Sequence, residues 1–341
     1  MRSELVKQIF LAFAQGNRDR FIEVAYQVVK EEEKKHHHLL AKDLKEILQG
    51  ITSGKNLSSH RISQRYKDAL PIPRDNEKGF PLLEVREYHL SWRDVILDEE
   101  LHQALHQIVE ENRQWEILAT HGLTPKQRVL FCGPPGTGKT LSAQVVSSVI
   151  GYPLANIRFD SIVSSFLGET ASNLRRIFQF IERGRWLVLF DEFDVIGKQR
   201  DDPHEHGEIK RVVNNFMQML DGFDGESLII AATNHQHLLD PGLWRRFDEI
   251  LFFDIPSHDR RVRIFTYYLK VLDKDPSLDL DALARETEGF SPADIAQVCW
   301  EALRRTVLKD GAQVGEQELR EAIARQKRRK AVQRRQHGAA V

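Results

Sequence analysis

The feature that most constrains this chain is an eight-residue loop between an apolar run and a helical pattern. The loop follows the pattern GxxxxGK[ST], with apolar residues at 129–131 before it and a helical pattern at 141–146 after it. Its residues, with the first residue of the helix, are Gly133, Pro134, Pro135, Gly136, Thr137, Gly138, Lys139, Thr140 and Leu141. Glycines let successive N–H groups face one anion, and the helix N-terminus adds partial positive charge. The pattern predicts a phosphate-binding loop in which Lys139 contacts the terminal phosphates and Thr140 binds Mg²⁺.

Strand and helix patterns alternate after this loop. Apolar runs predict strands at 154–159, 186–190, 228–232 and 250–253, and helices are predicted at 172–182 and 210–220. Such continuous apolar runs are typical of parallel strands that are buried on both faces. Beyond Pro256 the patterns are helical only, at 258–272, 279–287, 291–310 and 315–335. We therefore predict an α/β three-layer sandwich with a parallel sheet, as in P-loop NTPases, followed by a small all-helical lid.

The N-terminal residues predict a separate helical region. Apolar residues recur there at helical spacing up to Gly50, and the pattern then lapses into Ser, Gly, Lys, Asn and Pro. The predicted domains are an N-terminal helical bundle acting as an adaptor at 1–50, a linker at 51–88, a large α/β domain at 89–256, and a helical lid with a basic tail at 257–341.

The composition is that of an ordinary globular protein. The chain has 341 residues, of which 41% are hydrophobic and 29% charged, and its formal net charge of −1 indicates no partner by itself. Cys132 and Cys299 are far apart, without the spacing of a disulfide framework or a zinc site. No apolar run approaches a membrane span, and charges occupy the N-terminus where a signal peptide would need apolar residues. We expect a cytoplasmic protein with no membrane partner.

Polar residues follow two of the predicted strands. Asp191 and Glu192 come directly after 186–190, and Asn234 follows 228–232. Ligands of α/β sheets bind at the carboxyl ends of the strands. We expect Asp191 to hold Mg²⁺ through its water shell, Glu192 to act as general base, and Asn234 to orient the attacking water. Taken alone, these residues are equally explained as loop acids and a turn-forming asparagine.

Two consecutive arginines, Arg245 and Arg246, lie in the stretch LDPGLWRRFD. Arginines that stabilise the charge on a transferring phosphoryl group are called arginine fingers, and this pair is a candidate. An exposed pair with no such role is the alternative.

In combination, these motifs resemble the AAA family of ATPases, over about residues 90–310. The resemblance implies ATP and Mg²⁺ as cofactors. It also implies a homo-oligomeric ring, usually a hexamer in the ATP state, in which Arg245 and Arg246 reach the neighbouring subunit's nucleotide. Trp244 stands where many members have Arg or Leu, and a glycine before the second arginine is missing. The dominant finger is therefore left open.

Further site residues follow from the resemblance. Pro292 and Ala293, in the stretch GFSPAD, match the family's second-sensor region, which approaches the nucleotide here without an arginine. Val95 and Ile96 match the segment that cradles adenine, with Ile264 packing from the lid. Core packing explains these three residues equally well.

Phe166, Leu167 and Gly168 resemble the family's first pore loop, which lines the channel of a ring and grips an extended substrate. The resemblance favours a protein substrate. The chain contains neither an HExxH pair nor a GxSxG elbow, so a protease would be a separately encoded partner.

The C-terminal residues are strongly basic. The cations are Arg320, Arg325, Lys327, Arg328, Arg329, Lys330, Arg334 and Arg335. They predict either a solvated helix end, which we favour, or a segment that binds nucleic acid. Three functions follow: a ring motor that remodels, unfolds or disassembles proteins, a nucleic-acid-associated ATPase anchored by the tail, and a nucleotide-switched chaperone without translocation. The first is favoured because of Phe166.

Overall fold

The structure is a computed structural model that describes residues 24, 25, 27, 71–75, 79–158, 167–193, 206–235, 241–271, 273–274, 278–309 and 313–338. The chain divides into two units, residues 1–68 and 69–341, and the fold described below is that of the second. In the first unit Val24, Ala25 and Gln27 are helical. The rest of the predicted N-terminal bundle lies outside the described residues.

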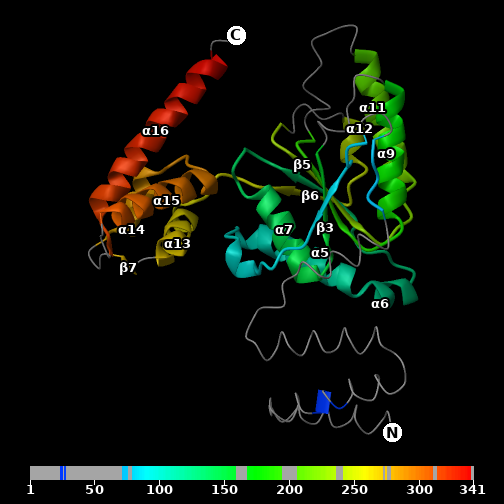
Figure 1. Ribbon diagram of the computed structural model, residues 1–341, viewed down its shortest axis with the longest axis horizontal. Helices are drawn as coiled ribbons and strands as arrows, with labels where there is room; N and C mark the ends of the chain where they lie inside the picture. The colour runs from blue at the N-terminus through cyan, green and yellow to red at the C-terminus, as the bar shows by residue number, and fades with distance from the viewer. Residues whose placement is uncertain are drawn as a thin grey trace. The chain divides into compact units, whose positions relative to one another are not determined.

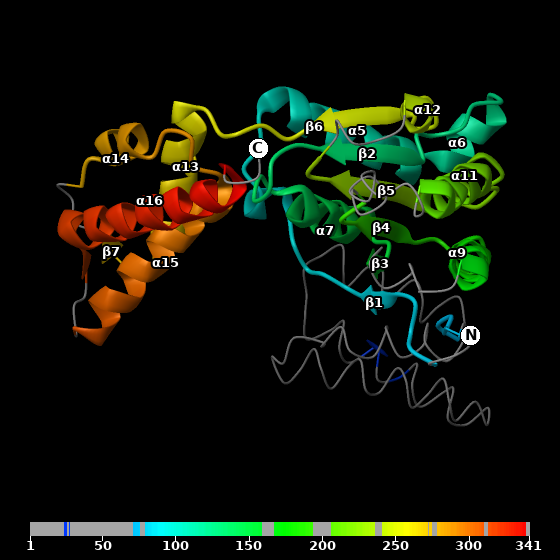
Figure 2. The same cartoon turned by 90° about the horizontal axis from the view of Figure 1, so that it is seen from above.

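A six-stranded sheet forms the centre of the larger unit. Its strands are β1 (Glu84–Arg86), β2 (Arg128–Cys132), β3 (Leu154–Arg158), β4 (Leu187–Asp191), β5 (Leu228–Thr233) and β6 (Glu249–Phe252). Their order in the sheet is β1-β3-β4-β5-β2-β6, which Figure 2 shows from bottom to top. Strands β2 to β6 pair in parallel, whereas β1 runs antiparallel to β3. The α/β class with a largely parallel sheet is confirmed, with one antiparallel strand added at an edge.

Helices cover both faces of this sheet. They are α5 (Glu99–Arg113), α6 (Trp115–Thr120), α7 (Lys139–Ile150), α9 (Leu167–Ile181), α11 (His206–Asp221) and the short α12 (Pro241–Trp244). Figure 1 shows α5 and α7 on one side of the strands and α9 and α11 on the other. Along β2, Val129 and Phe131 pack in the core under α5 and α7, whereas Leu130 and Cys132 pack in the core under α9 and α11. Because both faces are buried, the four positions of the strand after Arg128 all carry apolar side chains.

A helical lid follows β6. Its helices are α13 (His258–Tyr268), the 3₁₀ turn η3 (Leu269–Val271), α14 (Leu280–Glu286), α15 (Pro292–Leu308) and α16 (Glu316–Gly338). They enclose an apolar core that includes Phe265, Leu283 and Cys299. The expectation of helices only was wrong in one respect, because β7 (Asp273–Lys274) pairs in parallel with β8 (Gln313–Val314). Strands of two residues are too short to produce a periodic pattern.

The larger unit begins at residue 69, within the range 51–88 that was predicted to be a linker. Glu84–Arg86 is a strand of the sheet, and the segment before it is bound to α9. The Asn173 side chain donates to the Asp75 carboxylate at 3.3 Å, and Arg176 donates to the carbonyl oxygen of Arg74 at 2.8 Å. Pro71 and Pro73 suggested a linker, but proline also suits an extended segment beside a sheet edge.

Gly133, the first residue of the phosphate loop, has a conformation that only glycine adopts readily. Its φ is +140°, and a Cβ built on it would lie 2.1 Å from the carbonyl oxygen of Phe253, just after β6. The loop therefore leaves β2 in direct backbone contact with the neighbouring segment. Gly151, which ends α7, also has a positive φ of +84°, but an added Cβ there meets nothing within 4 Å.

Substitutions at these two glycines separate the cost of a left-handed backbone conformation from the cost of a steric collision. We expect Gly151→Ala to lower the free energy of unfolding by about 1–2 kcal/mol, the cost of a left-handed conformation for an L-residue. Gly133→Ala should cost clearly more, because it adds a backbone collision. Denaturant unfolding of the two variants measures both losses. Equal losses would contradict the contact between Gly133 and Phe253.

Candidate active site

Three candidate segments meet at one edge of the sheet. The phosphate loop follows β2, Asp191 ends β4, and Asn234 follows β5. Strands β4, β5 and β2 are neighbours and run in parallel, so their carboxyl ends share one edge. The fold thus brings together the loop, the acidic residues and a half-buried asparagine that are distant in sequence.

Thr140 and Asp191 are joined by a hydrogen bond. The Thr140 hydroxyl, in the first turn of α7, donates to Oδ2 of Asp191 at 3.1 Å. Oδ1 of Asp191 accepts the backbone N–H of Glu192 at 3.0 Å. Hydroxyl and carboxylate oxygens are the ligands that Mg²⁺ prefers, usually together with retained water. The pair therefore fits a magnesium ion, with Thr140 as a direct ligand and Asp191 acting through water.

Lys139 lies inside the phosphate loop. Its buried side chain donates from Nζ to the carbonyl oxygens of Gly133 at 2.7 Å and Pro134 at 2.8 Å. Gly138 precedes it with a φ of +104°, which turns the loop into the N-terminus of α7. An ammonium group beside a helix N-terminus concentrates positive charge, which suits the phosphates of a nucleotide. When bound, the nucleotide would supply the phosphoryl group that is transferred to water.

Cys132, the residue before the loop, has a packing role. Burial raises the pKa of its thiol to about 11, although the charge of Lys139 acts in the opposite direction. The thiol therefore stays protonated at neutral pH and does not act as a nucleophile.

Glu192 is exposed and has an unusual backbone conformation. Its φ is +53°, the one positive φ at a non-glycine residue among the described parts of the chain. Strained backbone of this kind is concentrated at functional sites. The next residue, Phe193, anchors the turn by donating its N–H to the carbonyl oxygen of Ala232 at 2.9 Å. The turn thus fixes the backbone of Glu192 at the end of β4, next to Asp191, and its role as general base stays a prediction.

The structure distinguishes the two arginines. Arg246 pairs through Nε with Asp221 at 2.8 Å and donates through Nη1 to the carbonyl oxygen of Gly242 at 2.7 Å. Arg245 is exposed and forms no ion pair with any described residue. Neither arginine is hydrogen-bonded to the phosphate loop in the described part of the chain. Arg246 is thus held by residues of its own chain, whereas no described residue pairs with Arg245.

The candidate second-sensor segment of the lid contacts the phosphate loop. The N–H of Ala293 donates to the carbonyl oxygen of Gly136 at 3.1 Å. A Cβ built on Gly136 would lie 2.8 Å from the Ser291 hydroxyl oxygen and 3.0 Å from the Ala293 Cβ. Pro292, between them, is the first residue of α15. The lid therefore meets the loop at a glycine that leaves no room for a side chain.

The three candidate adenine contacts divide between two cores. Val95 packs in the core under α5 and α7, whereas Ile264 lies in the lid core and Ile96 packs against that lid core. Ile96 and Ile264 thus belong to one cluster and Val95 to another. Contact with adenine stays a prediction for all three residues.

Two polar pairs that could not be predicted from the sequence bind residues 94–98 to α13. The Tyr267 hydroxyl donates to Asp94 at 3.0 Å. The buried Arg260 guanidinium pairs with Asp98 and donates to the carbonyl oxygen of Ile96 at 3.3 Å. The short spacing of the two aspartates was visible in the sequence, but nothing in it identified partners so distant along the chain.

The candidate pore loop is described only in part. Phe166 lies outside the described residues. Leu167 and Gly168 begin α9, so this helix starts earlier than the predicted helix at 172–182. The segment that resembles a pore loop is therefore continuous with a helix bound to the sheet.

The basic tail is a helix packed on the lid, and several of its cations are paired. Arg320 pairs with Glu286 at 2.9 Å, Arg325 with Glu301 at 2.7 Å, and Lys330 with Asp294 at 2.7 Å. The prediction of a solvated helix end holds for the exposed cations Lys327, Arg328 and Arg329 but was wrong for Lys330, which is half-buried. The side chains of Arg334 and Arg335 lie outside the described residues.

Among the described residues, no group of three or more His, Cys, Asp or Glu side chains is placed to hold a metal ion. None of the described helices combines the length and the apolar character needed to cross a bilayer.

A phosphate loop between a parallel strand and a helix, an acid at the end of a second parallel strand two places along the sheet, and a lid on the loop define a P-loop nucleotide hydrolase. Residues 129–255 match the family described as "ATPase family associated with various cellular activities (AAA)", and residues 277–321 match the AAA+ lid domain. The chain belongs to the AAA family of ATPases, and hydrolysis of ATP is its expected activity.

Several relatives are similar over most of this chain. An uncharacterized AAA family ATPase of Sinorhizobium fredii is 34% identical over 98% of each chain. The proteasome-activating nucleotidase of Saccharolobus solfataricus is 33% identical over 79% of this chain and 74% of its own length. The ATP-dependent zinc metalloprotease FtsH 1 of Thermomicrobium roseum is 35% identical over 69% of this chain but only 37% of its own length.

The roles predicted for Lys139 and Glu192 can be separated by mutation. Glu192→Gln should retain binding of ATP and Mg²⁺ but lower turnover by roughly two to four orders of magnitude, because only the general base is lost. Lys139→Ala should lose ATP binding itself. Nucleotide titration and phosphate release measure the two effects. ATP hydrolysis near the wild-type rate in Glu192→Gln would show that another group is the base.

Proposed function

We propose that this chain is a ring-forming ATPase that unfolds, remodels or disassembles protein substrates. The similarity to a proteasome-activating nucleotidase over 79% of this chain is the observation that carries the proposal. That similarity extends well beyond the phosphate loop. A second relative is an ATP-dependent protease of which this chain covers 37%, so the similarity is confined to part of that protein.

Phe166, with Leu167 and Gly168, is the segment proposed to contact the substrate. An aromatic side chain offers broad apolar contact that does not depend on sequence, which suits a motor that handles many polypeptides. Since the chain has neither an HExxH nor a GxSxG motif, degradation would require a separately encoded protease as partner. The N-terminal region is proposed to select the substrate, because it lies outside the ATPase unit.

The nucleic-acid alternative has less support. A nucleic-acid anchor requires cations that are free to neutralise phosphates. Arg320, Arg325 and Lys330 instead pair with carboxylates of the lid. Arg328 and Arg329 are exposed, so they provide the means to test this alternative.

In a homo-oligomeric ring, most simply a hexamer in the ATP state, the arginines would complete the neighbouring site. Arg245 is the proposed finger, and Arg246 the residue that anchors its segment through Asp221. Arg245→Ala should bind ATP but hydrolyse it roughly a thousandfold more slowly. Mixing the Arg245→Ala and Glu192→Gln proteins should restore part of the activity. In the mixed ring, some interfaces combine the intact Glu192 of one subunit with the intact Arg245 of the other.

Asp221→Ala serves as the control for this assignment. It should reproduce the effect of Arg246→Ala, because both remove the same ion pair, and it should not reproduce the full loss in Arg245→Ala. Activity of the mixtures and light scattering with ATP are the measurements. A fully active protein that stays monomeric with ATP would exclude action between subunits.

The substrate class is tested at Phe166. Phe166→Ala should keep basal ATPase activity but lose its stimulation by an unfolded protein. Phe80→Ala is the matched control, because Phe80 is an exposed phenylalanine that does not belong to the candidate pore loop. Arg328→Ala with Arg329→Ala should leave the stimulation unchanged.

The opposite result is equally specific. Stimulation by DNA or RNA that falls steeply with salt and is lost in the double arginine variant, but not in Phe166→Ala, would favour the nucleic-acid-associated ATPase. Nucleotide-dependent partner binding without any dependence on Phe166 would favour a chaperone that does not translocate.

A further inference from the structure

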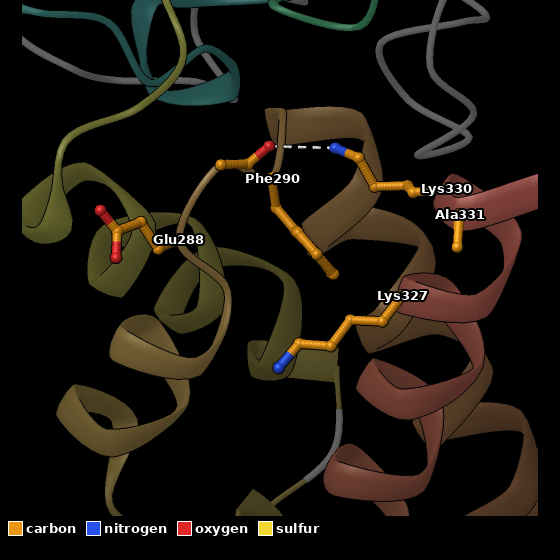
Figure 3. A pocket seen from close by; sticks show the side chains of 6 residues that line it. Glu288, Phe290, Lys327, Lys330 and Ala331 are labelled. Atoms are coloured by element: carbon orange, nitrogen blue, oxygen red, sulfur yellow. Dashed lines mark hydrogen bonds between the residues drawn. The ribbon is translucent and has the colours of Figure 1, made fainter. Parts of the chain in front are cut away.

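The C-terminal part of α16 lies against the start of α15, and Lys330 makes the connecting contacts. Its ammonium donates to Oδ2 of Asp294 at 2.7 Å and to the carbonyl oxygen of Gly289 at 3.0 Å. It also lies 5.0 Å from the centre of the Phe290 ring. Gly289 and Phe290 lie in the segment that connects α14 to α15, and Figure 3 shows Lys330 extending from α16 toward this segment. One lysine thus binds the C-terminal helix to three residues of the lid.

Asp294 is the acceptor on which these contacts converge. Its Oδ1 accepts from the buried Gln326 side chain at 2.7 Å, and its Oδ2 accepts the backbone N–H of Ser291 at 2.9 Å in addition to Lys330. Burial acts to raise the pKa of Asp294, but the hydrogen bonds from Lys330, Ser291 and Gln326 hold it below its usual value. The carboxylate stays ionised at neutral pH, so the whole network persists there.

The same turn of the lid contacts the phosphate loop. The Ser291 hydroxyl accepts the N–H of Asp294 at 3.2 Å, and the N–H of Ala293 donates to the carbonyl oxygen of Gly136 at 3.1 Å. Because a Cβ on Gly136 would lie within 2.8 Å of the Ser291 hydroxyl oxygen, the lid and the loop meet without spare room. A displacement of the Asp294 turn therefore acts directly on Gly136.

We propose that Lys330 and Gln326 are positioning residues for the nucleotide site. Through these two side chains, the C-terminal helix determines how the lid contacts the phosphate loop. Both act through Asp294, and neither is hydrogen-bonded to the loop. The proposal rests on the assignment of the loop as the nucleotide site and is independent of the proposed protein substrate.

A groove of about 420 Å³ beside this network supplies a matched control. Its lining residues are Glu288, Gly289, Phe290, Lys327, Lys330 and Ala331 (Figure 3). Lys327 precedes Lys330 by three residues on the same side of α16, but it is exposed and makes no ion pair with any described residue. Replacing Lys327 therefore removes an equal charge from the same groove without disturbing Asp294.

The experiment compares Lys330→Met with Lys327→Met in the full chain. We expect Lys330→Met to raise the KM for ATP and the Kd of a fluorescent ADP analogue by roughly fivefold or more, with kcat changed less than about twofold. The reason is that the lost hydrogen bond from Lys330 to Asp294 positions the lid at the nucleotide site, whereas Lys330 itself does not contact the reacting groups. Lys327→Met should match the wild type, and Lys330→Arg should regain part of the affinity because it retains a charged donor.

A double-mutant cycle tests whether Lys330 acts through Asp294. The double variant Lys330→Met with Asp294→Asn should lose less nucleotide affinity than the sum of the losses in the two single variants. The reason is that each single variant already breaks the same ion pair. Thermal unfolding of each variant establishes that it is folded. If Lys330→Met does not fold, Gln326→Leu carries the same prediction, because it removes the other side-chain donor to Asp294.

Two results would overturn the proposal: wild-type nucleotide affinity in folded Lys330→Met, or equal weakening in Lys327→Met. Normal nucleotide binding by Lys139→Ala would instead show that the site itself is assigned wrongly. A lack of stimulation by unfolded protein would count only against the remodelling function.

Discussion

The hydrogen bond between Thr140 and Asp191 is the contact on which the arrangement of the site depends. It joins the first turn of α7 to the end of β4, although β4 is separated from β2 in the sheet by β5. The bond therefore fixes the phosphate loop relative to the acids across the width of an intervening strand. Asn234, at the end of that strand, lies between the two by topology alone. Placing an anion-binding loop and a carboxylate side by side is what allows a magnesium ion to bridge them.

The central strands could be predicted because nearly all of their positions are buried, which makes their sequences almost continuously apolar. Strand β1 could not, since only Val85 of its three residues is buried. Strands β7 and β8 have two residues each, too few for the alternation of a strand to repeat. The phosphate loop was recognisable because its chemistry is local: the glycines, Lys139 and Thr140 act through one short stretch of backbone.

The contacts of the lid could not be predicted because their partners are distant in sequence. Tyr267 and Asp94 are 173 residues apart, and Lys330 and Asp294 are on different helices. From sequence, the cations of α16 resemble a charged surface segment. Three of them are paired because the acids of α14 and α15, among them Glu286 and Glu301, lie opposite once the lid is folded. Charge pattern alone therefore indicated a solvated or nucleic-acid-binding tail where the fold has built part of the lid.

The lid is bound to the large domain at two separate places, and this limits how it can move. Helix α13 is bound to the segment around Asp94 and Asp98, whereas the start of α15 is bound to Gly136. The chain itself supplies a further connection, because residues 253–257 join β6 to α13. The attachment at α13 consists of polar pairs with the segment before α5, whereas the attachment at α15 is a backbone contact with the phosphate loop itself. The start of α15 therefore couples the lid directly to that loop.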